Sequence, residues 1–184
     1  MAHADAELMR RWQRGDAAAF EELVRRWQAP IARFLARQVG RTELVADLCQ
    51  EVFLRVFRAG SRYRATGAFS TWLYQIALNV ARDAGRRRRQ PAPLDNHEPA
   101  EPGQSEAYSE QRELAEAVAT ALAELPAAQR EVLVLRHYEG MNFEEIARVL
   151  GTPASTLKSR FAAALERLRV RLNHLGWRHE ETKR

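Results

Sequence analysis

The sequence predicts an all-α protein of two small helical domains, joined by a flexible acidic linker. Apolar residues recur at steps of three and four along most of the chain, as they do in amphipathic helices. No stretch of useful length alternates apolar and polar residues as a half-buried strand does. Prolines and acids gather in the middle of the chain, where they oppose compaction. We therefore expect domains at 1–90 and 113–175, a linker at 91–112 and a short tail at 176–184.

The distribution of charge supports this division. Residues 1–90 hold 17 Lys and Arg against 9 Asp and Glu, a balance of +8, whereas residues 91–113 hold one Arg against six acids, a balance of −5. Residues 114–184 hold 11 basic and 9 acidic side chains, a balance of +2, and the whole chain carries +5. Two basic domains favour a polyanionic partner such as nucleic acid.

Three helices are expected in the first domain, over 16–39, 42–58 and 68–88. In the first of them, Asp16 supplies a start, Gly40 supplies a stop, and Pro30 should kink the middle. The second helix combines a long apolar face with an acidic polar face. The third carries one apolar stripe and then ends in four consecutive arginines, 86–89.

The second domain contains the most specific local pattern of the sequence. Helices are expected over 127–138, 142–150 and 154–173. Asn142 can cap the second of these helices, with Glu145 as its capping-box partner. Gly151 is placed to take a left-handed turn, and Pro153 stands near the start of the following helix. Two short helices joined by such a turn form a helix-turn-helix, whose second helix enters the major groove of DNA.

The start of that second helix suits contact with DNA. Ser155 and Thr156 are small and hydroxylated, which allows the helix amides to approach phosphates closely. Lys158 and Arg160 can contact phosphates or bases, and arginine fits the edge of a guanine well. The alternative is a helical hairpin whose basic face is only solvated.

A second candidate for DNA contact lies in the first domain, in the glycine-flanked loop of residues 60–72. Tyr63 and Arg64 stand between the two glycines, Gly60 and Gly67, and Phe69 and Trp72 stand at the end of this segment, where the third helix begins. Aromatic rings beside cations are what unpaired bases require, because every base has a face on which a ring can stack. The alternative is that Phe69 and Trp72 belong to the core.

Several classes of protein are excluded. The one cysteine, Cys49, allows no internal disulfide and fits a reducing cytoplasm. The five histidines are scattered, so we expect no metal site and no cofactor. No apolar run approaches the ~20 residues of a membrane span, and no signal peptide is expected. No catalytic constellation or phosphate-cradling glycine loop has usable spacing, so we expect neither an enzyme nor a small-molecule substrate.

Two parts of the chain resemble one protein family. Residues 47–59, followed by 63–64, 69–77 and 79, resemble region two of the extracytoplasmic-function sigma factors, and residues 125–160 resemble their region four. The resemblance extends over nearly the whole chain, in the order of the family. It implies a bacterial transcription-initiation factor that binds core RNA polymerase, recognises the −35 and −10 promoter elements and promotes strand opening.

The resemblance also implies roles for particular residues. Docking on the polymerase would fall to Asp47, Gln50, Glu51 and Arg55. Contacts with the −10 element would come from Arg62, Tyr63, Arg64, Phe69, Trp72, Gln75, Asn79 and Arg82. Contacts with the −35 element would come from Arg136, Ser155, Thr156, Lys158, Ser159 and Arg160. The partners implied are core RNA polymerase, promoter DNA and, as a further candidate, an anti-sigma protein that clasps both domains.

The chain departs from the family at a few positions. Ala46 stands where many relatives carry an acid, so docking is expected to depend more on Asp47 and Glu51. Ala163 and Leu165 stand where many relatives carry arginines, which weakens the expected grip on phosphates. Ser155 replaces a common glycine at the start of the recognition helix.

One alternative from another functional class is a one-component helix-turn-helix regulator that binds duplex DNA by itself. Such a regulator would leave the loop at 60–72 without a use, and the acidic face of the helix at 42–58 is unlike a ligand pocket. A sigma factor instead favours extruded bases over paired ones, and stacking repays only part of the cost of unstacking. We therefore expect the isolated chain to bind promoters poorly.

Overall fold

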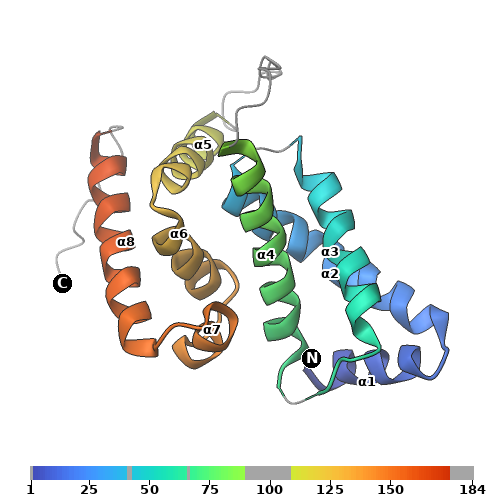
Figure 1. Cartoon of the computed structure of the whole chain (residues 1–184). Helices are drawn as coiled ribbons and strands as arrows, with labels where there is room; N and C mark the ends of the chain where they lie inside the picture. The colour runs from blue at the N-terminus through green and yellow to red at the C-terminus, as the bar shows by residue number, and fades with distance from the viewer. Residues whose placement is uncertain (1, 41–42, 66, 90–108, 175–184) are drawn as a thin grey trace.

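The chain folds into helices and turns over the part that the computed structural model describes, which is residues 2–40, 43–65, 67–89 and 109–174. The helices in chain order are α1 Ala2–Gln13, α2 Ala17–Val39, α3 Val45–Gly60, α4 Phe69–Arg89, α5 Ser109–Glu124, α6 Ala127–Leu133, the π-helical turn η2 Val134–Tyr138, α7 Phe143–Leu150 and α8 Ala154–His174. No strand occurs within these described ranges, and the predicted all-α fold is confirmed (Figure 1).

The ends of α2 follow from two residues that the sequence marks. Oδ1 of Asp16 accepts a hydrogen bond from the amide of Ala19 at 3.3 Å, which satisfies one of the donors left unpaired by the first turn. Gly40 takes φ +67° at the other end, a left-handed conformation that a side chain would strain. The helix continues through Pro30, so the proline does not end it.

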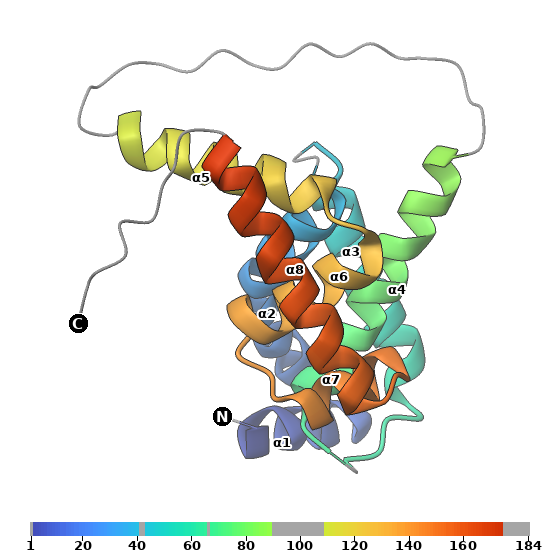
Figure 2. The same cartoon turned by 90° about the vertical axis from the view of Figure 1, so that its left-hand side faces the viewer.

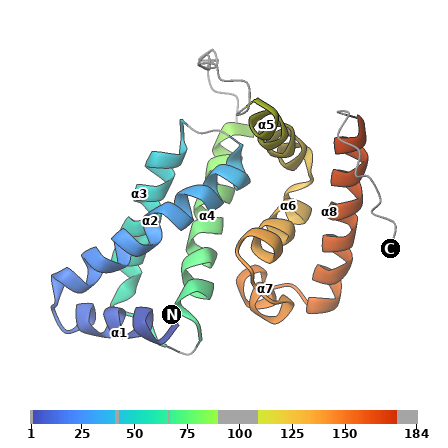
Figure 3. The same cartoon turned by 180° about the vertical axis from the view of Figure 1, so that it is seen from behind.

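Helix α1 is not expected from the sequence. Met9 is completely buried, and Asp5, which is 2% exposed, pairs with Arg26 of α2. At the other end of α1, Arg11 pairs with Asp16 at 2.7 Å. These contacts fix α1 against α2, and α1 lies beside the loop that joins α3 to α4 (Figures 1 and 3).

Helices α2, α3 and α4 enclose the core of the N-terminal half. Phe34, Leu35, Val52, Val56 and Leu73 are each at most 1% exposed. Burying one such side chain contributes about 1.5–3 kcal/mol. The core therefore holds α3 and α4 together and fixes the two ends of the loop between them.

The C-terminal half contains the predicted helix-turn-helix. Oδ1 of Asn142 accepts a hydrogen bond from the amide of Glu145 at 2.8 Å, and the Asn142 amide donates to Oε2 of Glu145 at 2.9 Å. Gly151 ends α7 in the left-handed region at φ +62°. The capping box and the glycine turn therefore set the geometry between α7 and α8, as the sequence predicts.

The two halves share one hydrophobic core. Tyr74 and Leu78 of α4 belong to the same buried cluster as Val134 and Leu135 of η2 and Ile146 of α7. Helix α4 lies between α3 on one side and α6 and α7 on the other, and the C-terminal end of α2 crosses α4 to reach α5 (Figures 1 and 3). We call this packing of the two halves the closed arrangement.

Polar contacts also join the halves in the closed arrangement. Nε and Nη2 of Arg82 donate to the two carboxylate oxygens of Glu131 at 2.7 and 2.6 Å. The hydroxyl of Tyr74 donates to Oε2 of Glu139. Burial raises the pKa of the Glu139 carboxyl, while the Tyr74 hydrogen bond and the charge of nearby Arg37 act in the opposite direction. Breaking the closed arrangement exposes these groups to water together with the shared core.

Most of the predicted linker falls within residues 90–108, which lie outside the described part of the chain, as does the predicted tail. Helix α5 begins at Ser109, before the expected start of the second domain at residue 113.

Candidate nucleic-acid and polymerase-binding surfaces

The loop between α3 and α4 borders a hollow of about 840 Å³. We call it the loop hollow. Five arginines line it with two aromatic rings, a hydroxyl and an amide: Arg55, Arg58, Arg62, Arg64, Arg148, Tyr63, Trp72, Thr71 and Gln75. Guanidinium groups attract phosphates, and aromatic rings stack on bases. The structure thus brings together five of the residues predicted for the −10 element, namely Arg62, Tyr63, Arg64, Trp72 and Gln75.

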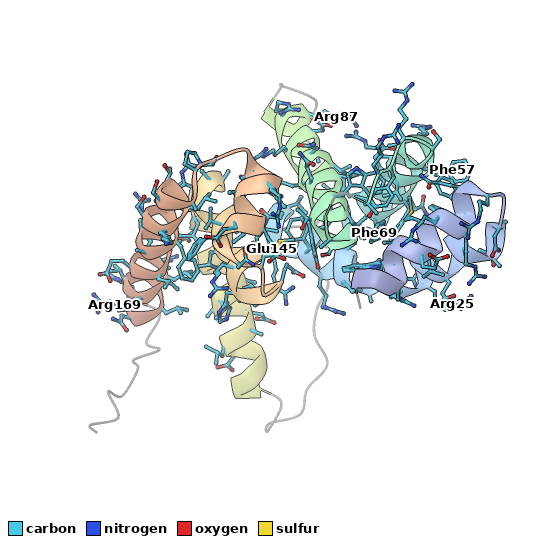
Figure 4. All side chains as sticks on the ribbon, turned by 90° about the horizontal axis from the view of Figure 1, so that it is seen from below. Arg25, Phe57, Phe69, Arg87, Glu145 and Arg169 are labelled. Carbon is cyan, nitrogen blue, oxygen red and sulfur yellow. The ribbon has the colours of Figure 1, made fainter. Side chains whose placement is uncertain are left out.

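Three packed rings support the loop. The ring centroid of Tyr63 lies 4.8 Å from that of Trp72 and 5.9 Å from that of Phe69. Tyr63 and Trp72 are half-buried, whereas Phe69, the first residue of α4, is 1% exposed (Figure 4). The expected DNA contact by Phe69 is therefore not supported, because the ring has no free face. Its place is under the Tyr63–Trp72 pair, which it holds at the surface.

Two hydroxyls that line the hollow lack a partner within the described residues. They are Oη of Tyr63 and Oγ1 of Thr71, and both atoms are buried. Burial also raises the pKa of Tyr63, so the phenol stays protonated and able to donate. An unpaired buried polar group costs about 1–3 kcal/mol.

The polar face of α4 continues away from the loop hollow. Gln75 and Asn79 are exposed there, as a DNA contact requires. Arg82 lies on the same face, but both of its bonded nitrogens are held by Glu131 of α6. In the closed arrangement these two nitrogens are therefore not free to bind a phosphate. The expected contact between Arg82 and DNA requires this ion pair to break.

Helix α3 carries the residues expected to dock on the polymerase. Two of them are exposed, and the other two are held in ion pairs. Asp47 and Gln50 are exposed. Glu51 instead accepts from Arg55 at 2.7 Å, and Arg55 also binds Asp83 of α4 at 2.9 Å. The hydrogen bond from Arg55 lowers the pKa of both carboxyls. Arg55 therefore ties α3 to α4 and is not free to act as a docking group.

An apolar groove, which the sequence did not predict, lies beside Gln50. It lies between α2 and α3, has a volume of about 890 Å³ and is lined by Phe20, Val24, Phe53, Leu54 and Phe57 among others. Leu54 and Phe57 are 49% and 54% exposed, which is unusual for large apolar side chains. The apolar residues of α3 extend beyond one buried stripe, and that surplus was the signal available in the sequence.

The start of α8 presents the residues predicted for the −35 element. Ser155, Lys158 and Ser159 are exposed, and Thr156 and Arg160 are partly exposed. Oγ of Ser159 donates to the carbonyl of Thr156 at 2.9 Å. The turn before α8 lies at the same end of the molecule as the α3–α4 loop (Figures 1 and 2).

Arg136 has a second role that the sequence does not reveal. Its Nη1 donates to the carbonyl of Met141 at 3.0 Å, and its guanidinium lies 5.4 Å from the ring centroid of Phe143. Arg136 thus braces η2 against the start of α7 while remaining exposed. Further along α8, Ala163 and Leu165 are exposed and offer no charge to a phosphate.

Among the described residues, no group of three or more His, Cys, Asp or Glu side chains is placed to hold a metal ion. Nor is any helix in the described ranges both long and apolar enough to span a membrane.

Comparisons with known proteins identify the family of the chain. The family described as Sigma-70 region 2 matches residues 23–90, and Sigma-70, region 4 matches residues 115–168. The RNA polymerase sigma-H factor of Pseudomonas aeruginosa is 34% identical over 174 residues, which cover 88% of this chain and 90% of that protein. The ECF RNA polymerase sigma-E factor of Escherichia coli K12 is also 34% identical over 174 residues, covering 88% and 91%.

Solved structures give the same result. CnrH in complex with the cytosolic domain of CnrY superposes with a TM-score of 0.71 at 26% identity, over 93% of this chain and 98% of that one. The sigma factor RpoE in complex with the anti-sigma factor NepR from Bartonella quintana has a TM-score of 0.67 at 21% identity, over 84% and 96%, and shares the fold.

A helix-turn-helix in one half and a basic, aromatic loop in the other are features typical of a DNA-binding protein. The chain belongs to the sigma-70 family, and within it to the extracytoplasmic-function sigma factors. Its function is therefore that of an RNA polymerase sigma factor, which recognises promoters and initiates transcription.

Proposed function

We propose that this sigma factor captures an unpaired base of the −10 element in the loop hollow and contacts the −35 element with the start of α8. The loop hollow carries the proposal, because five arginines line it together with two packed aromatic rings. This chemistry suits an extruded nucleotide. Duplex DNA gains little from it, since the bases of a duplex are already stacked.

Polymerase must supply much of the binding energy. Extruding a base costs a few kcal/mol, and stacking on a ring returns about 1–3 kcal/mol. We propose that α3 makes the main contact with the polymerase, through Asp47 and Gln50 at the edge of the apolar groove. Exposed Leu54 and Phe57 add the large apolar side chains that stable interfaces contain. The partner surface should combine basic and apolar groups.

Engaging both promoter elements requires the closed arrangement to open. The −35 and −10 elements are about 25 base pairs apart, which is roughly 85 Å of B-form DNA at 3.4 Å per pair. A compact chain of this length has a radius of gyration of only about 16 Å. The segment 90–108 between the halves can span up to about 60 Å when extended. We therefore propose that the contacts between Arg82 and Glu131 break on the promoter.

Weakening the contacts between the halves should favour the open form. In the double variant Glu131→Gln with Tyr74→Phe, the charge that holds Arg82 and the hydroxyl that binds Glu139 are both removed. We expect small-angle X-ray scattering to give a larger radius of gyration than for the wild type, with little change in helix content by circular dichroism.

The matched control for that variant is Glu124→Gln. Glu124 pairs with Arg171 at 2.7 Å, but both residues belong to the C-terminal half, so the radius of gyration should not change. An unchanged radius in the double variant would mean that apolar packing alone holds the closed arrangement.

The −35 contact can be divided between base recognition and phosphate binding. Arg160→Ala should weaken transcription and, if the guanidinium contacts a base, relax preference at one position by about 1–3 kcal/mol. Lys158→Ala should weaken all sequences alike and reduce the salt slope of binding by about one. Holoenzyme affinities for a set of −35 variants over a range of salt measure both quantities.

Arg169 provides the control for these two substitutions. It lies at the outer edge of α8, where it pairs with Glu166 at 2.7 Å, and Arg169→Ala should leave −35 preference unchanged (Figure 4). Equal, sequence-independent losses from Arg160→Ala and Lys158→Ala would show that neither side chain recognises bases.

The remaining proposals concern organisation and partners. We propose that the −10 and docking functions belong to residues 1–90 and the −35 function to 113–175, with the acidic segment 91–112 as the linker. We further propose that the chain catalyses nothing itself and works in the cytoplasm with its polymerase. RpoE from Bartonella quintana was solved in complex with the anti-sigma factor NepR, and an anti-sigma protein is a candidate partner here too.

A further inference from the structure

The end of α1 is bonded directly to the loop that the proposed function assigns to the −10 element. Gln13 is the last residue of α1, and its side-chain amide donates to two backbone carbonyls. Nε2 lies 2.7 Å from the carbonyl oxygen of Gly60 and 3.0 Å from that of Tyr63. One NH₂ group has two donors, so both bonds can be made at once.

The two carbonyls are the ends of a single tight turn. The amide of Tyr63 donates to the carbonyl of Gly60 at 3.0 Å, and Gln13 bonds to both residues of that pair. The turn is the first part of the chain after α3. Because the Tyr63 carbonyl directly precedes Arg64, fixing it also fixes the direction in which Arg64 leaves the turn.

Trp12 holds the same turn by contact. A Cβ atom added to Gly60 would lie 1.9 Å from Cζ3 of Trp12, so the indole packs directly on the backbone of Gly60. The Trp12 ring also lies 5.1 Å from Phe20 and 5.3 Å from Phe57 between centroids. The end of α1 therefore cannot shift without moving the turn or breaking this aromatic cluster.

Helix α1 is itself firmly held, as a support must be. Met9 is completely buried, Asp5 pairs with Arg26, and Arg11 pairs with Asp16. All of these α1 residues precede residue 23, where the match to the region 2 family begins. The support thus comes from a part of the chain to which the family match assigns nothing.

We propose that Gln13 is a positioning residue for base capture, which holds Tyr63 and Arg64 in the orientation that admits an extruded base. The inference rests on the proposed function of the loop hollow. A loop fixed in advance binds without losing the freedom of its backbone at that moment. Without the two bonds, Tyr63 and Arg64 remain present but their placement is no longer unique.

The test uses holoenzyme assembled from the full chain and core polymerase. Gln13→Glu keeps the size of the side chain and replaces both donors with a carboxylate, which repels the two carbonyls. Gln13→Met removes the donors without adding charge. Capture of a 2-aminopurine placed at successive −10 positions of a forked template is followed by fluorescence, alongside the rate of opening of a duplex promoter.

We expect both variants to slow opening by about tenfold, the equivalent of two ordinary hydrogen bonds, and to lose preference for the captured base. Affinity for core polymerase, affinity for −35 duplex and thermal stability should stay at the wild-type values. Arg14→Gln is the matched control, because it makes the same change in net charge as Gln13→Glu at the next residue. The Arg14 guanidinium pairs with Glu7 of α1, so this variant should behave as wild type.

Two results would overturn the inference. One is wild-type base preference in Gln13→Met, which would mean that the bonds do not position the loop. The other is an equal loss of stability, core binding and −35 binding, which would mean that Gln13 has only a structural role. A failure of the proposed base capture would give a different result. In that case the variant with both Tyr63 and Arg64 replaced by alanine would open duplex promoters at the wild-type rate.

Discussion

Replacing Tyr63 and Arg64 together with alanine is expected to reduce transcription from a duplex promoter by about 10- to 100-fold in the holoenzyme, because stacking on one base is worth about 1–3 kcal/mol. Both residues line the loop hollow, and the Tyr63 ring packs against Phe69 and Trp72. Permanganate reactivity of thymines near the start site follows strand opening directly. A template with a pre-melted −10 region should recover part of the activity, since the cost of unstacking has already been met.

Tyr63→Phe is the control that separates base capture from loop packing. Its ring keeps the contacts with Phe69 and Trp72, and the lost hydroxyl has no partner within the described residues. This variant should therefore open duplex promoters at close to the wild-type rate. Wild-type opening by the double alanine variant would contradict the loop assignment and would favour a regulator that binds only duplex DNA.

Charge reversal on α3 is expected to abolish co-purification with core polymerase. In the variant Asp47→Arg with Glu51→Arg, two acids beside the apolar groove become cations, and like charges across an interface cost several kcal/mol. Asp47 is exposed and should matter most. Glu51 also holds Arg55, so its reversal disturbs the link between α3 and α4 in addition to the docking surface.

The control for charge reversal is Glu7→Arg with Glu22→Arg, which changes the net charge equally. Glu22 bonds Arg26 four residues away at 2.8 Å, and Arg26 also bonds Asp5, so its setting closely repeats that of Glu51, Arg55 and Asp83. The control should retain polymerase. Undiminished binding by the α3 variant, with helix content unchanged, would remove this docking assignment.

The sequence predicted local structure well wherever a single residue determines where a helix begins or ends. Asp16 and Gly40 bound α2, and Asn142, Glu145 and Gly151 set the helix-turn-helix. Helix α1 was not predicted, because its twelve residues depend on contacts with α2 more than on their own pattern. The closed arrangement could not be predicted from the sequence either. The sequence pattern does not distinguish an apolar residue that packs between domains from one that packs within a domain.

The sequence predicted most of the residues of the candidate site, but not all of their surroundings. Tyr63, Arg64 and Trp72 meet around one hollow, as expected from the loop sequence. Phe69 and Arg82 differ because their surroundings come from residues distant in the chain, the first through burial and the second through Glu131. No local sequence pattern predicts a partner that is distant in the chain. Gln13 and Arg148 were missed for the same reason, although both reach the loop or its hollow.

Run-off transcription with purified core polymerase tests the central claim most directly. The chain and core enzyme together should produce RNA of one defined length from a duplex template that carries a cognate promoter, and neither component alone should do so. The isolated chain should bind the same promoter poorly. The contrary result is tight, specific binding of the duplex by the chain alone, with no promoter-dependent transcript when core polymerase is added.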